Sequence, residues 1–194
     1  QASQKVGMGL DLYENSTLGK QFFDTANDIM GVDIQHIIFN GPEEELKQTQ
    51  FTQPAIYIVS VIIGMLMLEN GIQPSCAAGH SLGEYSALTL AKSFDFETGL
   101  NLVKVRAEGM QFAGTQNPGT MAAVIGLDDE TTQNICNQYS NGIVVAANFN
   151  AKGQVVISGE VDAVHAVMPL LKDAGAMKVI ELNVSGAFHS PLMT

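Results

Sequence analysis

The sequence predicts an α/β protein built from two parts, and three observations lead to that prediction. Residues 1–118 carry helix patterns interrupted by one short run of small residues, 74–79, which we expect to form a strand. A breaker between Gly114 and Gly119 ends this part. Beyond it, strand and helix patterns follow in the order βαββαβ, which is typical of the split βαβ or ferredoxin-like subdomain.

Start and stop signals place the helices of the first part. Carboxylates that follow Gly41-Pro42 suit the first turn of a helix, and Asp95 is a good N-cap before Phe96. We expect helices that begin at Glu43, at 54–71, at 85–92 and from Asp95 toward Gln111, where Leu100, Val103 and Met110 share one face.

Alternating periodicity defines the second part, which we expect to be a subdomain of residues 119–184. The expected strands are 121–125, 143–147, 154–158 and 177–182, and the expected helices are 128–139 and 161–174. Residues 185–194 are too few to form a unit, so we expect them to return to the large subdomain formed by residues 1–118.

Length and composition exclude several classes of protein. The chain has 194 residues, of which 46% are apolar, so a core of ordinary size can form. A net charge of −11 argues against a nucleic-acid partner or an anionic membrane surface. The most apolar stretch, 55–68, is shorter than the roughly 18 to 20 residues of a membrane span, so we expect a core helix there.

The sequence indicates neither a metal site nor export. Cys76 and Cys136 have no spacing that suits zinc and form no disulfide framework. Residues 1–10 lack the basic start and apolar run of a signal peptide. We therefore expect no metal ion and a cytoplasmic location.

The segment Gly79-His80-Ser81-Leu82-Gly83 has the G-x-S-x-G pattern between an expected strand and an expected helix. That context is the one a nucleophile elbow requires. A tight turn would strain the backbone of Ser81 and expose its hydroxyl, and the N–H of Leu82 would point toward a developing oxyanion. We therefore expect Ser81 to be a nucleophile.

A serine nucleophile needs a base, and of the four histidines His189 is the best candidate. It lies among small residues just after the last expected strand, where catalytic groups tend to collect. A loop histidine without a role is the alternative. His80 should point away from the nucleophile, while His36 and His165 lie in helical patterns and are expected to be ordinary structural residues.

No carboxylate clearly completes a catalytic triad. Acids between Ser81 and His189 fall at expected helix ends, where capping explains them more simply. These acids are Asp128, Asp129, Glu160 and Asp173. A Ser–His dyad oriented by a backbone carbonyl therefore stays open.

Arg106 is the single arginine among nine basic residues. It is either a solvent-exposed cation or a residue of the site. In the second case its planar guanidinium would bind a carboxylate through two hydrogen bonds and select a substrate with a free acid group.

A series of ordered motifs runs nearly from end to end of the chain. They are Gln1-Ala2-Ser3-Gln4, Val6-Gly7-Met8-Gly9, Thr52-Gln53-Pro54-Ala55, the stretch 79–87 around Ser81, Arg106, the stretch 119–127, Asn148-Phe149-Asn150 and the stretch 184–193. Together they resemble the malonyl-CoA:acyl-carrier-protein transacylases and the related acyltransferase domains of polyketide synthases.

The resemblance implies a fold and a set of site residues. The fold is a hydrolase-like α/β large domain with a parallel sheet, into which the ferredoxin-like subdomain is inserted. Ser81 would be the nucleophile and His189 its base, held by a main-chain carbonyl. Arg106 would pair with the malonyl carboxylate, and Gln1 and the N–H of Leu82 would form the oxyanion hole. Two further residues would line the cleft, Met110 and Asn150.

The resemblance also implies a ping-pong reaction. Ser81 would accept the malonyl group from malonyl-CoA, and the phosphopantetheine thiol of an acyl carrier protein would then remove it. No cofactor is required. The residues at 49–54 and 184–189 look especially like those of free-standing acyltransferases that serve polyketide synthases, although a fatty-acid transacylase shares most of them.

Two departures from the family pattern stand out. Ala2 replaces a family glycine in the loop near the nucleophile, and family members extend both before Gln1 and beyond Pro191-Leu192-Met193. We therefore expect a fragment, truncated at both ends, that is inactive by itself. The partners expected for the whole protein are malonyl-CoA and an acyl carrier protein, without nucleic acid or membrane, in a monomer or in association with a synthase.

Two other functions compete with this one. A serine hydrolase or esterase that acts on acyl thioesters would share the G-x-S-x-G turn, although it gains nothing from a buried cation at Arg106. A noncatalytic docking module of a synthase would keep the turn as a vestige. Labelling of Ser81 by malonyl-CoA separates the second alternative from an enzyme.

Overall fold

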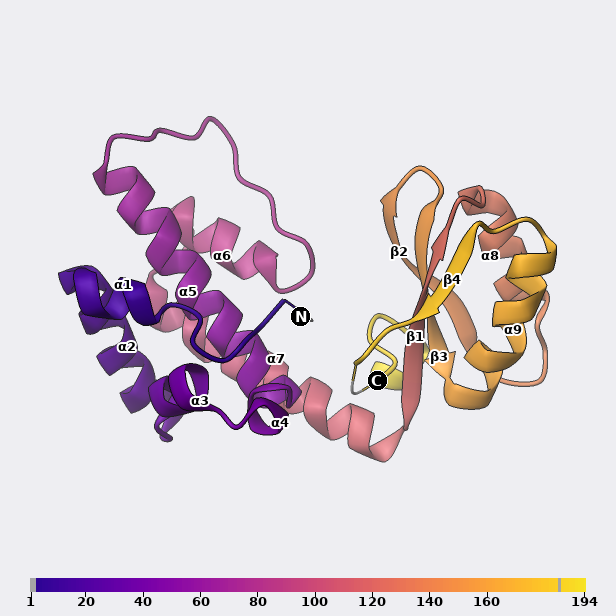
Figure 1. The fold of residues 1–194 in the computed structure, drawn as a ribbon, viewed down its shortest axis with the longest axis horizontal. Helices are drawn as coiled ribbons and strands as arrows, with labels where there is room; N and C mark the ends of the chain where they lie inside the picture. Colours follow the sequence, from indigo (N-terminus) through magenta and orange to yellow (C-terminus); the bar gives the residue numbers. More distant parts are fainter. Residues whose placement is uncertain (1–2, 185) are drawn as a thin grey trace. The chain divides into compact units, whose positions relative to one another are not determined.

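The chain forms two compact units, residues 1–109 and 110–194. The computed structural model describes residues 3–184 and 186–194. Figure 1 shows helices in the first unit and a sheet with two helices in the second. The protein is therefore α/β in class, as the sequence predicts, and its described residues contain a small antiparallel sheet.

The described part of the first unit consists of helices joined by loops. The helices are α1 (Leu10–Asn15), α2 (Thr17–Met30), α3 (Ile34–Asn40), α4 (Glu43–Leu46), α5 (Thr49–Glu69), α6 (Gly83–Leu90) and the first part of α7 (Phe96–Gln116). Fully buried side chains from α2, α3, α5 and α7 form one core, with Phe23, Ile38, Ile58, Ile62 and Leu100 among them. The expected helix start at Glu43 is confirmed by α4.

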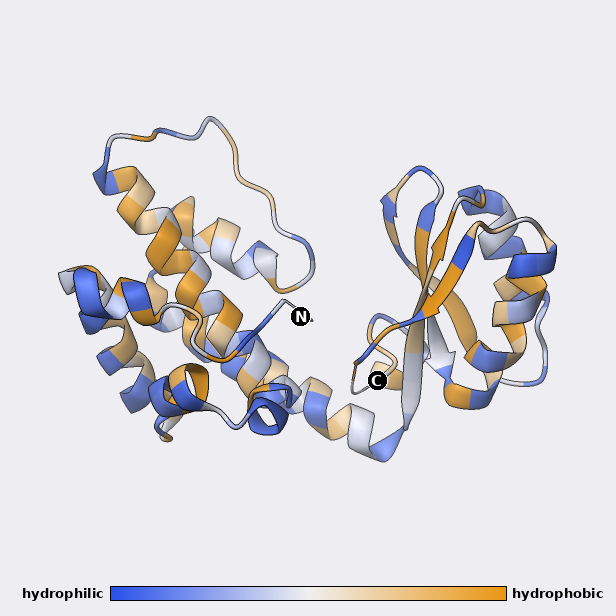
Figure 2. Ribbon diagram, viewed as in Figure 1, coloured by the Kyte–Doolittle hydropathy of each residue, from blue (hydrophilic) through white to orange (hydrophobic). Residues whose placement is uncertain are grey.

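Helix α5 is the central apolar helix of this unit, and Figure 2 shows it as predominantly hydrophobic. By length and composition alone this helix could cross a membrane, yet half of its most apolar 18-residue stretch is buried in the structure. Its buried face includes Tyr57, Ile58 and Ile62. This packing agrees with the core helix that the sequence predicts.

The start of α5 differs from the prediction. The helix begins at Thr49 rather than at Pro54, which lies inside the helix. The hydroxyl of Thr52 donates to the carbonyl oxygen of Leu46, and Thr52 is fully buried. Burial of this turn against the end of α4 stabilises the helix before the proline, although a proline removes one helical hydrogen bond.

The expected strand at 74–79 is wrong for this structure. These residues form a loop from α5 to α6, and 71–78 are exposed (Figure 1). A strand exists only through hydrogen bonds to a neighbouring strand, and the described residues of the first unit supply none. The small residues of this segment led to the prediction of an extended backbone, but their sequence pattern does not show whether a neighbouring strand is present to pair with it.

Helix α7 begins where its cap predicts but ends later than expected. The carboxylate of Asp95 accepts a hydrogen bond from the N–H of Thr98, which confirms it as the N-cap. The helix continues through Gly114 to Gln116, so it ends inside the expected breaker 114–119 rather than near Gln111. Gly114 is buried, and a Cβ built on Gly186 would lie 3.4 Å from its Cα. The absent side chain permits this close approach, which offsets the poor helix propensity of glycine.

The second unit has its six main elements in the predicted order. They are β1 (Gly119–Ile125), α8 (Asp129–Gln138), β2 (Val144–Ala151), β3 (Gln154–Glu160), α9 (Val161–Asp173) and β4 (Lys178–Glu181). The strands form one sheet in the order β2-β3-β1-β4, and all neighbours are antiparallel. On the central strand β1, Ala122 lies opposite Ile157 of β3 and Glu181 of β4.

The two faces of this sheet are covered differently. Helices α8 and α9 lie on one side (Figure 1), where Val124, Ile157 and Val164 belong to one buried cluster. A second cluster contains Met121, Val156 and Phe188. Strand alternation sends neighbouring residues such as Val156 and Ile157 to opposite faces, which explains the two clusters.

Residues 186–194 belong to the second unit in this structure, where they pack against its other residues. Phe188 is 5% exposed in the cluster with Met121, and the side-chain amide of Asn117 donates to the carbonyl of Leu192. A short 3₁₀ helix, η1 (Pro191–Met193), ends the chain. The expected boundaries at 118/119 and 184/185 thus differ from the division at 109/110, and membership of 185–194 in the large subdomain stays a prediction.

Candidate active site

Ser81 has the strained backbone that a nucleophile elbow requires. Its φ is 52°, in the left-handed region that side-chain-bearing residues rarely adopt. Gly79 makes the turn possible, because a Cβ there would lie 1.9 Å from the carbonyl carbon of Gly83. Gly83 itself faces open space among the described residues. The sequence therefore predicts the shape of this turn, although the strand expected before it is absent.

The turn leads directly into helix α6. The N–H groups of Gly83, Glu84 and Tyr85 donate to the carbonyls of His80, Ser81 and Leu82, over 2.9, 3.3 and 3.0 Å. In the described part of the chain no backbone carbonyl accepts from the N–H of Leu82. Donors at a helix start suit a developing negative charge, and the oxyanion role of Leu82 stays a prediction.

Arg106 faces the turn rather than the solvent. Its Nη2 donates to the hydroxyl oxygen of Ser81 over 2.9 Å, and its Nη1 donates to the side-chain carbonyl of Gln53. The guanidinium carbon lies 5.9 Å from the ring centroid of Tyr85, within cation–π range. The simpler interpretation of Arg106 as a free surface cation is therefore wrong.

The charge of Arg106 is partly removed from water. Burial lowers its pKa below the ordinary value, while Tyr85 and Glu84 act in the opposite direction, and an arginine stays protonated in proteins. Among the described residues no Asp or Glu carboxylate forms an ion pair with it. A half-buried cation without an acidic partner is suited to bind an anionic group of a ligand.

Gln53 is the site residue that sequence reasoning missed. It occurs in the motif Thr52-Gln53-Pro54-Ala55, but no role was expected for it. The structure places it 1% exposed on α5, bonded to Arg106. A polar side chain within a strongly apolar helix was the available signal, because such a residue is retained where it has a hydrogen-bond partner.

The remaining candidate residues lie in the second unit or outside the described residues. His189 is exposed, with a φ of 58°, and follows the buried Phe188. Asn150 is exposed on β2, and Met110 packs against the cluster around Met121. The catalytic role of His189 and the cleft-lining roles of Met110 and Asn150 stay predictions. Gln1 lies outside the described residues.

The other histidines have local partners. Nδ1 of His36 lies 3.1 Å from the amide of Asn40, and Nε2 of His165 lies 3.0 Å from a carboxylate oxygen of Glu181. His165 and Thr120 hold the pKa of Glu181 below its ordinary value. These contacts agree with the structural roles that the sequence predicts for the two histidines.

The described residues contain no group of three His, Cys, Asp or Glu side chains that could hold a metal ion. Cys76 is exposed and Cys136 is buried, and both are free thiols. Burial raises the pKa of Cys136 to about 11, so it stays protonated near neutral pH.

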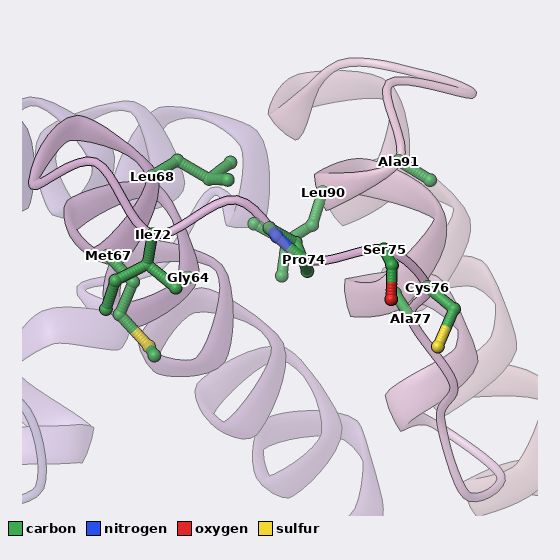
Figure 3. A pocket seen from close by; sticks show the side chains of 10 residues that line it. All are labelled: Gly64, Met67, Leu68, Ile72, Pro74, Ser75, Cys76, Ala77, Leu90 and Ala91. Carbon is green, nitrogen blue, oxygen red and sulfur yellow. The ribbon is translucent and has the colours of Figure 1, made fainter.

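Two hollows lie along the loop that follows α5. A cavity of about 440 Å³ is lined by apolar side chains that include Met67, Ile72 and Leu90, together with Cys76 (Figure 3). A second, of about 520 Å³, reaches the turn itself at Gly79 and Leu82. The turn is therefore bordered by open space on the side of the loop.

The comparisons with known proteins agree along the whole chain. Residues 1–194 match the family described as acyl transferase domain. The chain is 40% identical over 195 residues to the malonyl CoA-acyl carrier protein transacylase of Bacillus subtilis (strain 168), covering 100% of the chain and 62% of that relative. It is 42% identical over 195 residues to the polyketide biosynthesis malonyl CoA-acyl carrier protein transacylase PksC of the same organism. This match covers 100% of the chain and 66% of that relative.

Solved structures are equally similar. The malonyl-transacylase PlMCAT, in complex with the type II polyketide synthase acyl-carrier protein AntF, has a TM-score of 0.93 and 42% identity, with 100% of this chain and 63% of that chain covered. MCAT from Streptococcus pneumoniae has a TM-score of 0.92 and 42% sequence identity, and the match covers 100% of this chain and 63% of that chain. The chain thus spans 62–66% of the length of the relatives described above.

Proposed function

The chain belongs to the acyl transferase domain family, and from this premise we propose that the protein transfers a malonyl group from malonyl-CoA to the phosphopantetheine thiol of an acyl carrier protein. The observation that carries the proposal is the contact between Arg106 and Ser81, with 2.9 Å between Nη2 and Oγ. A cation beside a strained serine suits a substrate that has a carbonyl to be attacked and an acid group to be held.

In the first half-reaction, Ser81 Oγ attacks the thioester carbonyl of malonyl-CoA. His189 takes the serine proton, the C–S bond breaks, and CoA leaves as a thiol with that proton. The product is a malonyl-serine ester. In the second half-reaction, the phosphopantetheine thiol gives its proton to His189 and attacks the ester, so that serine is regenerated with the returned proton.

Arg106 supplies selectivity in this scheme. A malonyl group carries a carboxylate that the guanidinium binds, whereas an acetyl group leaves the half-buried cation without that partner. The hydrogen bond from Arg106 to Ser81 is exchanged for one to the substrate acid when malonyl-CoA binds. This exchange also frees a lone pair of the serine oxygen.

In this proposal the N–H of Leu82 and Gln1 donate hydrogen bonds to the oxyanion of each tetrahedral intermediate. The Leu82 N–H is supported by its place before the first turn of α6. Gln1 rests on the family resemblance alone. Ala2, where the family has glycine, follows Gln1 in the sequence.

The finer fold also belongs to the proposal. We assign residues 1–118 and 185–194 to a hydrolase-like large subdomain and 119–184 to a ferredoxin-like subdomain. The TM-score of 0.93 to a solved transacylase and the sheet order β2-β3-β1-β4 support this assignment. In it, Met110 and Asn150 line the substrate cleft.

The partners follow from the same chemistry. Malonyl-CoA and an acyl carrier protein are the substrates, and the reaction needs neither a metal ion nor a cofactor. The solved complex of a relative with its acyl-carrier protein supports such a partner. We assign the protein to the cytoplasm, as a monomer or in association with a synthase of fatty-acid or polyketide synthesis.

The test is to incubate the full-length protein, of which residues 1–194 form a part in this proposal, with labelled malonyl-CoA, with and without a holo acyl carrier protein. We expect the mass of one malonyl group on the peptide that contains Ser81, its loss when the carrier is added, and neither event in Ser81→Ala. Free malonate released at the same rate with and without carrier would identify a hydrolase, and absence of label would indicate a docking module.

A further inference from the structure

We infer that Gln53 is a positioning residue that holds Arg106 through a neutral acceptor and thereby keeps the charge of Arg106 available to the acid group of the substrate. The inference rests on the proposed function and adds a determinant of acyl-group selectivity to it. Gln53 would act through Arg106 and need not touch the reacting atoms.

The contacts on the guanidinium divide its two terminal nitrogens between two partners. Nη1 donates to the amide carbonyl of Gln53, and Nη2 donates to Ser81. The ring of Tyr85 lies on the guanidinium at 5.9 Å. Gln53 thus restrains one end of the group while the other end faces the nucleophile.

Gln53 is well placed to be rigid. Its side chain is 1% exposed, whereas Arg106 is only half-buried. A buried amide has few alternative rotamers and no water with which to exchange its hydrogen bond. The guanidinium therefore meets an acceptor whose position is set before any substrate binds.

The neutrality of Gln53 matters as much as its position. A carboxylate at the same place would form a charge-assisted pair with the guanidinium, which is stronger than the bond to an amide carbonyl. It would neutralise Arg106 and compete with the acid of the substrate. An amide accepts the hydrogen bond and leaves the positive charge unpaired.

A buried hydrogen-bond network one helical turn away fixes the helices that carry these residues. Tyr57, four residues after Gln53 on α5, has its hydroxyl 2.8 Å from Oγ1 of Thr89 on α6 and 3.1 Å from the carbonyl of Phe96 on α7. Residues four apart share a helix face. Tyr57 therefore lies next to Gln53, and Thr89 lies next to Tyr85.

The network stays intact over the working pH range. Tyr57 and Thr89 are buried, and burial raises the pKa of Tyr57 to about 12, so its hydroxyl keeps its proton. Thr89 also donates to the carbonyl of Tyr85 over 2.9 Å. Helices α5, α6 and α7 are thus tied together beside the group formed by Gln53, Tyr85 and Arg106.

The experiment compares Gln53→Glu, Gln53→Met and the matched control Gln50→Glu in the full-length protein. Gln50 lies on the same helix and bonds to Gln48 rather than to Arg106. For each variant, kcat and KM are measured with malonyl-CoA and with acetyl-CoA, and thermal unfolding is recorded in parallel.

For Gln53→Glu we expect the ratio of kcat/KM for malonyl-CoA to that for acetyl-CoA to fall by about tenfold or more, mainly through a higher KM for malonyl-CoA. Its melting temperature should be equal to or above that of the wild type, since the new carboxylate pairs with Arg106. Gln53→Met, which is neutral but lacks the acceptor, should lower the ratio about threefold. Gln50→Glu should leave the ratio within about twofold of wild type.

An unchanged ratio in Gln53→Glu, with native melting, would overturn the inference. Equal losses on both substrates with a lower melting temperature would also overturn it, because they show a role in stability alone. If the wild type itself transfers no malonyl group, the proposed function has failed instead, so the two failures are distinguishable.

Discussion

Nη2 of Arg106 lies 2.9 Å from Oγ of Ser81, so the single arginine of the sequence contacts the serine at the strained turn. Arg106 lies on α7, whereas Ser81 lies in the turn before α6, and the two residues are 25 positions apart along the chain. Their contact joins a nucleophile candidate to the one side chain suited to two-point recognition of a carboxylate. The contact therefore supports the proposed preference of the site for acidic acyl groups, which the G-x-S-x-G pattern alone does not indicate.

Replacement of Arg106 by alanine should weaken selectivity between acyl groups. Hydrogen bonds to charged groups contribute about 1.5–3 kcal/mol, so kcat/KM for malonyl-CoA should fall about 10- to 100-fold relative to acetyl-CoA. Steady-state kinetics with both thioesters measure the ratio. Arg106→Lys keeps the positive charge but lacks the planar guanidinium, so its selectivity ratio should lie between those of the wild type and Arg106→Ala. An unaltered ratio in Arg106→Ala would refute the role of Arg106 in selectivity.

Gly79→Ala should destabilise the turn that carries Ser81. The added Cβ would lie 1.9 Å from a backbone carbon, so the turn must shift at a cost of roughly 2–3 kcal/mol. Gly83→Ala is the matched control, because the described structure leaves open space beside Gly83 at the start of α6. Urea unfolding of both variants checks the prediction, which fails if their midpoints agree.

Tyr57→Phe should lower stability by about 1–3 kcal/mol. The change leaves the buried hydroxyl of Thr89 and the carbonyl of Phe96 without the contact that Tyr57 makes. Tyr13→Phe is the control, since the ring of Tyr13 packs on Phe23 and Phe39 and the substitution preserves it. Chemical unfolding should separate the two variants, and equal free energies of unfolding would contradict the network.

Asp128 should make stability depend on acid pH. Its carboxylate accepts from Thr131, and this bond holds the pKa of Asp128 below its ordinary value of 3.8. A carboxyl with a lower pKa in the folded state contributes stability above its unfolded pKa and loses it as pH falls through the folded pKa.

The comparison with Asp128→Asn isolates that contribution. Asparagine caps a helix about as well as aspartate but does not titrate. The difference in the free energy of unfolding between wild type and Asp128→Asn should therefore be constant above about pH 5 and shrink below pH 4 in favour of the variant. Guanidinium unfolding at several pH values measures it, and a difference that is independent of pH would count against the prediction.

The sequence predicted the second unit well because its signals are local. Strand alternation and caps such as Asp128 and Asp95 depend on neighbours within a few residues, and the structure contains them. Strand formation at 74–79 depends on a neighbouring strand, which no local pattern encodes, and this prediction was wrong. The helix start at Pro54 failed for a similar reason, since contacts with α4 extended the helix backward.

The site was predictable in its residue types but only partly in its contacts. The G-x-S-x-G spacing predicted the strained turn at Ser81, because the backbone geometry follows from glycine positions. The orientation of Arg106 depends on how α7 packs against α5 and α6, so the sequence left two interpretations open. Gln53 was missed because its importance arises only once Arg106 reaches it from the other helix.

The loop at 71–78 gives the protein a built-in chemical reporter. Cys76 is exposed in this loop, whereas Cys136 is buried and has a raised pKa of about 11. A maleimide or iodoacetamide should therefore alkylate Cys76 quickly and Cys136 only after unfolding. Any polypeptide or ligand that comes to lie along this loop should slow alkylation at Cys76, so the rate of modification measures how well that flank is covered, without a substituted residue or an attached probe.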